Sequence, residues 1–253
     1  MNGQPLMSFN KLIRQISKPI MPANISEDAI QKVSVIVPMY NAGPYIAEAL
    51  ESILTQTLPV SEIFVIDDGS TDNGCGIVGG YSNVVLLKKD HSGISDTLNQ
   101  GLKYASGEYI AFLDADDRWI ADKTEKQVRL LAEDDDLAMV FGHAERFQSI
   151  GEGNTYEEII IDRMPGLVLQ GGLFRHSAFQ KVGLFSADPD VNPFMDWYAR
   201  ALAAGLEPVI HDQVVFQRRI HGNNYTLLNK NELLKGYFNA LKMSIDRKRN
   251  QAL

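Results

Sequence analysis

Short apolar runs alternate with amphipathic stretches along the chain from Val33 onward. Five short, mostly apolar runs predict strands: VSVIV (33–37), IFVI (63–66), VVLL (84–87), YIAFL (109–113) and AMVF (138–141). The first of them is β-branched and continuous, as expected for a strand buried on both faces. In the stretches 46–54 and 94–102, apolar residues recur at helical spacing. Strands that alternate with helices indicate a parallel α/β sheet with right-handed crossovers.

The second half of the chain is less regular. The spacing predicts a helix over 122–132, and the segment 166–179, with its Gly pair, predicts a loop followed by a helical turn. Pro193 near the start and Gly205 at the end bound a helix over 192–205. The segment 214–224 predicts a strand that runs into a polar loop.

Both ends of the chain carry basic segments. Residues 1–20 hold Lys11, Arg14, Lys18 and no acid, and their apolar residues fall at helical spacing, so we expect a basic amphipathic helix in an extension over 1–31. The segment 226–253 predicts a second basic helix. Such helices can make a peripheral contact with an anionic membrane surface. The alternative is that these two helices pack on the domain to which they belong.

Composition narrows the class of protein. The 253 residues are enough for one large domain with extensions, and a net charge of −8 argues against a nucleic-acid binder. A single cysteine, Cys75, excludes an internal disulfide and suits a reducing compartment. No apolar stretch is long enough to span a bilayer, and Lys11 and Arg14 interrupt what a signal peptide would need. We therefore expect a cytoplasmic protein, with membrane association left open.

Acidic residues gather where predicted strands end. Asp114, Asp116 and Asp117 follow the strand at 109–113, and Asp67 and Asp68 end the strand at 63–66. Ligands of open parallel sheets bind beyond the carboxyl ends of the strands. Carboxylates this close resist ionisation unless a cation lies among them, and their oxygens suit Mg²⁺ or Mn²⁺. The preference of aspartate for turns gives a plainer alternative, an acidic loop without a metal.

Several common sites are absent from the sequence. It has no G-x-x-x-x-G-K-[ST] motif and no G-x-G-x-x-G after its first predicted strand, which argues against nucleotide sites of those two kinds. The spacing of His and Cys gives no zinc site.

Six segments occur in the order and spacing of family 2 glycosyltransferases, which the chain resembles over residues 32–225. The segments are VSVIVPMYNAGPYIAEALESILTQT, IFVIDDGSTDN, SGISDTLNQGL, GEYIAFLDADDRW, LFRHSAFQKVGLF and DWYARAL. That family consists of inverting enzymes with the GT-A fold. The resemblance implies an α/β fold with a mostly parallel central sheet, helices on both faces and short helical extensions at both termini. It also implies a nucleotide-binding half over 32–118 and an acceptor-binding half over 119–225.

The resemblance also implies roles for individual residues. Pro38, Tyr40 and Asp68, assisted by Asp67, would hold the nucleotide of a sugar donor. In the D-x-D motif, Asp116 would ligate Mn²⁺ or Mg²⁺, and Asp114 would reach the metal or the ribose.

Further residues would act on the diphosphate and the acceptor. His221 matches a position that contacts the metal or the diphosphate, and Arg218 or Arg219 could pair with phosphate oxygens. Asp196 matches the family's catalytic base, a carboxylate at the start of a late helix, although the Glu that usually precedes this base is missing. The alternative is that Asp196 only stabilises the first turn of its helix through the helix dipole. Asp188 and Asp190 are the nearby alternatives for the base.

The expected function is transfer of a sugar from a nucleotide-diphosphate donor, by default a UDP-sugar, to an acceptor hydroxyl. The transfer would be a metal-assisted single displacement with inversion and a carboxylate base. Saccharide, lipid-linked and peptide acceptors all stay open. One alternative, a sugar-nucleotide nucleotidyltransferase, would need a Gly-rich loop with Arg or Lys after the first strand, which PMYNAG does not provide. The other alternative is a non-catalytic module that binds sugar nucleotides. The presence of Asp68, Asp114, Asp116 and Asp196 argues against it.

Overall fold

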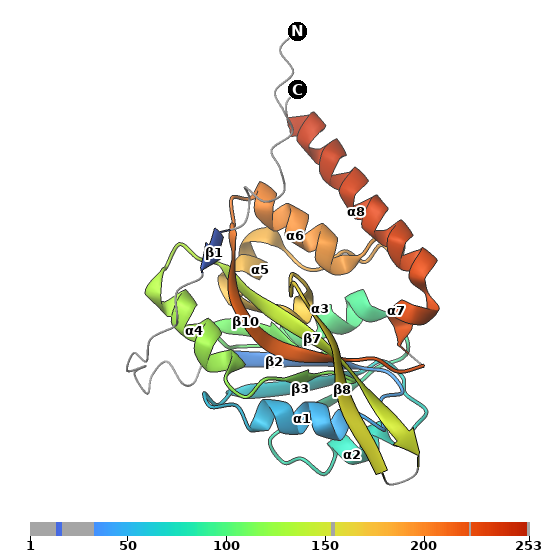
Figure 1. The fold of residues 1–253 in the computed structure, drawn as a ribbon. Helices are drawn as coiled ribbons and strands as arrows, with labels where there is room; N and C mark the ends of the chain where they lie inside the picture. Colours follow the sequence, from blue (N-terminus) through green and yellow to red (C-terminus); the bar gives the residue numbers. More distant parts are fainter. Residues whose placement is uncertain (1–13, 17–32, 153–154, 223, 252–253) are drawn as a thin grey trace.

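The centre of the fold is one ten-stranded sheet in the computed structural model, which describes residues 14–16, 33–152, 155–222 and 224–251 (Figure 1). The main order is β1-β10-β7-β9-β5-β2-β3-β4, while β6 pairs with β10 and β8 with β7. The strands are β1 (Arg14–Ile16), β2 (Val33–Met39), β3 (Glu62–Asp67), β4 (Val85–Lys88), β5 (Tyr109–Phe112), β6 (Arg118–Trp119), β7 (Met139–Glu152), β8 (Thr155–Met164), β9 (Gly172–Arg175) and β10 (Pro208–Arg219).

Most neighbouring strands of the sheet run parallel. β2 pairs in parallel with β3 and β5, β3 with β4, and β10 with β1 and β7. β9 is antiparallel to its neighbours β5 and β7, as β6 is to β10 and β8 to β7. The predicted mostly parallel α/β sheet is therefore confirmed, and each of the five predicted strands overlaps an observed one.

Helices cover both faces of the sheet, as predicted. The helices are α1 (Ile46–Leu54), α2 (Gly74–Val78), α3 (Ile94–Tyr104), α4 (Lys123–Glu133), α5 (His176–Val182), α6 (Pro193–Ala203), α7 (Tyr225–Leu228) and α8 (Lys230–Gln251), with a 3-10 turn, η3, at Leu169–Gly171. Side chains alternate along β2: Val35 belongs to the core cluster that includes residues of α1 and α4, and Ile36 belongs to the cluster that includes residues of α3, α5 and α6. Because both faces of the central strands are buried, both alternating sets of their side chains are mostly apolar.

The helix α6 confirms the helix predicted over 192–205. The side chain of Asn192 accepts a hydrogen bond from the N–H of Met195 at 3.0 Å, and Pro193 occupies the first turn. Gly205 follows the helix with a φ of 78°, a left-handed conformation that favours glycine. α8 lies on the outer side of α6 (Figure 1), so the predicted C-terminal basic helix is also observed.

The N-terminal prediction is wrong where the structure describes it. Arg14–Ile16 form β1, which pairs in parallel with β10 through Arg14 and Val209 and through Ile16 and His211. The edge of β10 offers unpaired backbone groups, and pairing with them outweighs a helical spacing of apolar residues. The rest of the predicted helix and of the extension over 1–31 lies outside the described residues.

The structure also corrects the second half of the chain. The segment 166–179 contains β9, which lies in the middle of the sheet, where a loop was expected. Gly172 is required there, because a Cβ would lie 2.5 Å from the ring of Phe174. β7 continues far beyond the predicted 138–141 and forms a long antiparallel hairpin with β8.

Candidate active site

Two loops at the carboxyl ends of β2 and β3 are joined by hydrogen bonds. The N–H of Asn41 donates to Ser70 Oγ at 2.8 Å, and Asn41 Oδ1 accepts from the N–H of Thr71 at 2.8 Å. Asn41 has a φ of 49°, a left-handed conformation in which asparagine is among the better tolerated residues. These bonds bring the segments that follow both strands to one edge of the sheet, as the sequence predicted.

The predicted nucleotide residues Pro38 and Tyr40 lie at this edge. Pro38 lacks an N–H, but β5 pairs with β2 only as far as Ile36, so no ladder bond is lost on that side. The side chain of Tyr40 is 52% exposed, and its ring centroid lies 4.6 Å from that of His91. An exposed aromatic pair offers a stacking surface to a planar ring.

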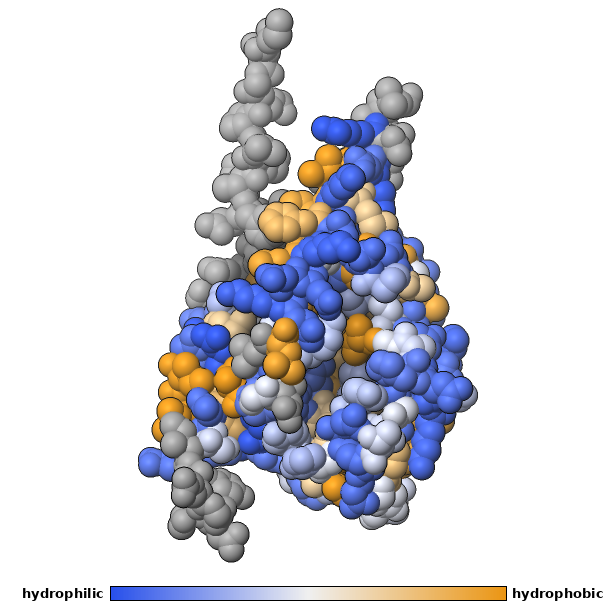
Figure 2. All heavy atoms as spheres, turned by 90° about the vertical axis from the view of Figure 1, so that its right-hand side faces the viewer, coloured by the Kyte–Doolittle hydropathy of each residue, from blue (hydrophilic) through white to orange (hydrophobic). Residues whose placement is uncertain are grey.

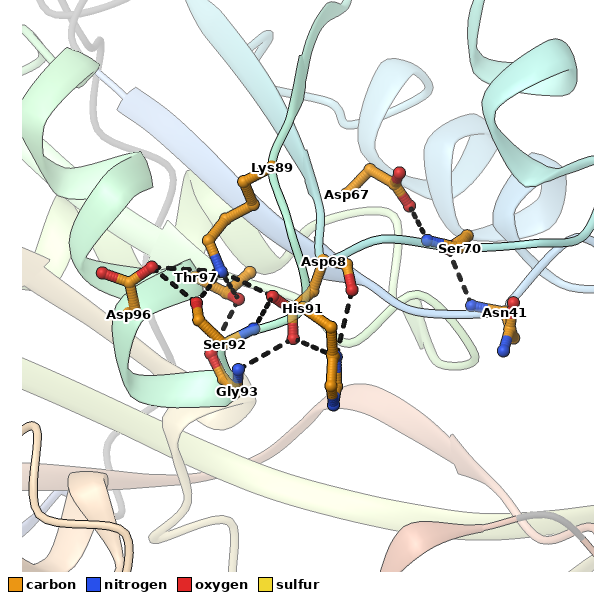
Figure 3. Close-up of polar contacts among 10 residues, drawn as sticks. All are labelled: Asn41, Asp67, Asp68, Ser70, Lys89, His91, Ser92, Gly93, Asp96 and Thr97. Carbon is orange, nitrogen blue, oxygen red and sulfur yellow. Dashed lines mark hydrogen bonds and ion pairs between the residues drawn. The ribbon is translucent and has the colours of Figure 1, made fainter.

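Asp68 organises the segment between β4 and α3 (Figure 3). Its Oδ1 accepts from Lys89 Nζ at 2.5 Å and from the N–H of Ser92 at 2.9 Å. Its Oδ2 accepts from the N–H of Gly93 at 3.0 Å and lies 2.9 Å from His91 Nδ1. Burial alone would raise the pKa of Asp68, but the hydrogen bonds from Lys89 and from the two backbone N–H groups outweigh it and lower the pKa.

The hydrogen-bonding capacity of Asp68 is thus filled by four donors of the protein. A carboxylate offers about four acceptor positions, so a nucleobase would have to replace one donor. His91 is the most replaceable, because its side chain is 60% exposed. Asp67 is also buried, and its Oδ1 accepts the N–H of Ser70 at 3.2 Å, which fixes the turn after β3.

The acidic cluster follows β5. Asp114, Asp116 and Asp117 each offer a carboxylate oxygen, and these three oxygens lie within 4.8 Å of one another. Burial, and then the charge of Asp116, raises the pKa of Asp114 to about 6. The same two causes, with the charge of Asp114, raise the pKa of Asp117 well above its ordinary value. Negative charge that is only partly compensated, presented by oxygen atoms, fits a divalent cation such as Mg²⁺ or Mn²⁺.

Residues distant in sequence complete the cluster. His221 Nε2 lies 3.0 Å from Asp116 Oδ2, and Asn224 Nδ2 donates to the same oxygen at 3.1 Å. The ring of Tyr45 stacks on that of His221 with centroids 4.5 Å apart. Gln170 Nε2 donates to Asp114 Oδ2. The predicted proximity of Asp114, Asp116 and His221 is therefore observed, while Tyr45, Gln170 and Asn224 were not anticipated.

The two arginines predicted for phosphate differ in their surroundings. The guanidinium of Arg219 is buried, donates to Glu48 Oε2 and to the carbonyl oxygen of Asp116, and packs on the ring of Phe147. Arg218 donates to Thr226 Oγ1 at 2.8 Å, and its positive charge lowers the pKa of Asp114. Arg218 is thus the better placed of the two for a phosphate, and Arg219 supports the acidic loop from behind.

Trp119, which follows the acidic cluster, belongs to the core. It is 4% exposed, and Lys123 Nζ lies 4.6 Å from its ring. Lys123 is fully buried and donates to Gln127 Oε1 at 2.5 Å and to the carbonyl oxygen of Gly172 at 3.0 Å. Burial lowers the pKa of Lys123 to about 7.

Asp196, the predicted base, is held in two ion pairs. Its Oδ2 accepts from Arg200 Nε at 2.9 Å, its Oδ1 accepts from Arg247 at 2.5 Å, and the side chain is 1% exposed. Arg200 lies one turn along α6, and Arg247 reaches in from α8. Both oxygens are occupied by cationic donors, which argues against Asp196 accepting a proton from an acceptor hydroxyl. The alternatives Asp188 and Asp190 are exposed.

Comparison with known proteins gives a consistent assignment. A family model described as glycosyl transferase family 2 matches residues 34–191, inside the predicted 32–225. The chain is 37% identical over 142 residues to an uncharacterized glycosyltransferase of Escherichia coli, YibD, with 54% of this chain and 40% of that protein covered. It is 40% identical over 116 residues to the Escherichia coli UDP-Glc:alpha-D-GlcNAc-diphosphoundecaprenol beta-1,3-glucosyltransferase WfgD, with 45% and 46% covered. The matches thus span less than half the length of either relative.

A solved structure shares the fold. The mannosyltransferase PcManGT from Pyrobaculum calidifontis, in complex with GDP-Man and Mn²⁺, superposes with a TM-score of 0.65 at 20% identity. The superposition covers 83% of this chain and 64% of that one. At this identity the likeness concerns the fold, and it agrees with the GT-A-type sheet.

Proposed function

The chain belongs to glycosyl transferase family 2, and from this premise we propose that it moves a sugar from a nucleotide-diphosphate donor to an acceptor hydroxyl with inversion. The observation that carries the proposal is the acidic cluster, in which three carboxylate oxygens lie within 4.8 Å of one another. The cluster follows β5, the parallel neighbour of β2, and so lies at the same edge of the sheet as the loops after β2 and β3. In this proposal residues 32–118 form the nucleotide-binding half, and residues 119–225 form the acceptor-binding half.

The nucleotide would bind over the loops after β2 and β3. Tyr40 offers an exposed ring for the base, and Pro38 and Asp67 shape the backbone beneath it. Asp68 would recognise the nucleoside either directly, in place of His91, or through the segment that it holds. We take UDP as the default nucleotide, which the name of WfgD supports, whereas PcManGT was solved with GDP-Man.

The acidic cluster would hold Mn²⁺ or Mg²⁺ through Asp114, Asp116 and Asp117, with His221 at its edge. A bound divalent cation supplies Lewis-acid stabilisation of the departing nucleoside diphosphate. Arg218 adds a positive charge next to the cluster and can pair with phosphate oxygens. His221 could ligate the metal only through an unprotonated ring nitrogen. The stacked ring of Tyr45 holds the imidazole of His221 in place.

An inverting displacement needs a base that takes the proton of the acceptor hydroxyl as the oxygen attacks. For Asp196 to be this base, its ion pairs with Arg200 and Arg247 must open. The same observation favours a second candidate function, a module that binds sugar nucleotides without catalysis. A transfer assay with wild-type protein separates the two, since the module would bind the donor without turning it over.

The acceptor belongs to the proposal only as a class. Saccharide, lipid-linked and peptide acceptors were all expected from the sequence. The name of WfgD, which includes a diphosphoundecaprenol acceptor, supports the lipid-linked class.

The decisive experiment is calorimetric titration of UDP in the presence and absence of Mn²⁺. Asp116→Asn should abolish the increase in affinity that Mn²⁺ gives, because Asp116 belongs to the acidic cluster and contacts His221 and Asn224. Asp188→Asn, which changes an exposed acid outside the cluster, is the matched control and should titrate like wild type. Wild-type affinity with Mn²⁺ in the Asp116 variant would contradict the proposed metal site.

A further inference from the structure

The helix α8 carries an apolar stripe on its exposed side. The stripe consists of five large side chains that are between 42% and 68% exposed: Leu234, Tyr237, Phe238, Leu241 and Ile245. Their spacing of three and four residues puts them on one face of the helix. Figure 2 shows hydrophobic and hydrophilic side chains side by side along the upper part of the molecule, where α8 runs.

The orientation of this stripe is fixed by contacts on the opposite face of α8. The carbonyl oxygen of Gly236 accepts the N–H of Asn192 at 3.2 Å, and a Cβ at Gly236 would lie 3.1 Å from that nitrogen. Ala240 is buried, and Arg247 reaches Asp196 in α6. Because small residues and this ion pair hold one face against the domain, the apolar stripe must point away from it.

The charge of α8 is opposite to that of the rest of the chain. Residues 230–251 contain six Lys or Arg and two Asp or Glu, so the helix carries +4 in a chain whose net charge is −8, which leaves −12 for the remainder. Lys242 lies four residues after Phe238, and Arg249 four after Ile245, so both border the stripe. Long basic side chains at such borders can place their charges in water while their stems cover apolar surface.

We propose that α8, together with α7, docks the protein on an anionic lipid bilayer. None of the described helices is long and apolar enough to cross a membrane, so the helix would lie in the interface rather than span it. A helix with an apolar face and basic borders matches that environment, since acyl chains cover the stripe and anionic headgroups attract the cations. A second copy of the chain fits less well, because the exposed cations Lys242 and Arg249 that border the stripe would meet their like charges on the second helix.

This surface begins at the edge of the candidate active site. Tyr225 and Leu228 of α7 are 63% and 66% exposed, and they closely follow Asn224, whose side chain donates to Asp116. Docking through α7 and α8 therefore brings the acidic cluster close to the bilayer surface. An acceptor anchored in that bilayer would be presented to the site without leaving the membrane.

The test is flotation of the full chain with two kinds of vesicle, one of phosphatidylcholine alone and one that also contains phosphatidylglycerol. We expect wild-type protein to float with the anionic vesicles and to be released as salt is raised. Phe238→Ser combined with Leu241→Ser should lower the partition coefficient by at least about ten-fold, because two large apolar side chains no longer enter the interface. Ile160→Ser combined with Ile161→Ser, which changes similarly exposed residues on β8, is the matched control and should float like wild type.

The charged border is tested separately. Lys242→Gln and Arg249→Gln should each weaken binding to anionic vesicles by about five-fold, the value of one cation near such a surface, and should not affect binding of UDP. Thermal unfolding verifies that every variant is folded, which is expected because the changed side chains are exposed.

Three results would overturn the proposal. The first is wild-type protein that does not float with anionic vesicles. The second is a Phe238 and Leu241 double variant that floats as well as its β8 control. The third is a dimer in light scattering that the same double variant dissociates while vesicles are not bound, since a second copy would then cover the stripe. None of these results depends on sugar transfer, so they are independent of the proposed function.

Discussion

Asp196→Asn should loosen the contact between α6 and α8. In the wild type both carboxylate oxygens of Asp196 accept from arginines, Arg200 within the same helix and Arg247 from α8. Asparagine keeps the size of the side chain but has no charge, and its amide nitrogen cannot accept from either arginine. One guanidinium therefore loses its bond to residue 196, and the other keeps a bond there only to a neutral oxygen, while Arg200 retains its bonds to the carbonyl oxygens of Val182 and Leu184.

The magnitude follows from the two bonds. A hydrogen bond to a charged group contributes about 1.5–3 kcal/mol, and the lower value applies here because Arg200 and Arg247 are 22% and 33% exposed and water can replace part of the loss. Two bonds give about 3 kcal/mol of unfolding free energy. At about 2–4 °C per kcal/mol for a chain of this size, Tm should fall by about 6–12 °C. Arg247→Met removes only the bond from α8 and should give about half of that shift.

The assay combines thermal unfolding with donor binding and sugar transfer on the same preparations. If Asp196 is an anchor, Tm falls in both variants and transfer declines only as far as the site loosens. If Asp196 is the base, Asp196→Asn lowers transfer by about 10²- to 10⁴-fold while Arg247→Met transfers sugar nearly as wild type does. An unchanged Tm together with that loss of transfer would refute the anchoring role derived from the structure.

Three other predictions concern charge. The pKa of Asp114 is raised to about 6, so its carboxylate destabilises the metal-free fold above that pH. Asp114→Asn should therefore raise Tm near pH 7, and this gain should shrink toward about pH 4, the ordinary pKa of the group. A gain in Tm that does not depend on pH would exclude this cause. Burial lowers the pKa of Lys123 to about 7, so the unfolding free energy of wild type relative to Lys123→Met should rise between about pH 7 and pH 10, as measured by urea unfolding. If this difference in unfolding free energy does not change with pH, Lys123 stays charged in the fold. Asp68→Asn should weaken UDP binding to the same extent with and without a chelator, in contrast to Asp116→Asn, and calorimetry showing a loss only with Mn²⁺ would place Asp68 with the metal instead.

The parallel half of the fold was predictable because its signal is local. Strands such as β2 and β3 are apolar on both faces, and the residues that end them must lie at one edge of the sheet. For the same reason the order of strands and acids along the chain was enough to predict that Asp68 and Asp116 lie at the same edge of the sheet. β9 gave no such signal, since it has four residues and begins with a glycine that close packing requires.

The contacts that decide the roles of the site residues could not be predicted. Gln170 lies 56 residues from Asp114, and Arg247 lies 51 residues from Asp196. Periodicity shows which face of an element is buried, but not which element covers it. The difference between Arg218 and Arg219 is a partial exception, because neighbouring strand residues point to opposite faces and only one of them could turn toward a ligand.

The sequence separations around the acidic cluster also determine when the site can form during folding. Asp116 meets His221 and Asn224 across 105 and 108 residues, and Arg219 reaches Glu48 across 171. By contrast, the loops after β2 and β3 join across only 29 or 30 residues. Contacts of long range must bear a larger loss of chain entropy before they form, so they slow folding. A nascent chain can therefore join the loops after β2 and β3 early, yet the acidic cluster lacks His221 and Asn224 until β10 and the start of α7 have left the ribosome.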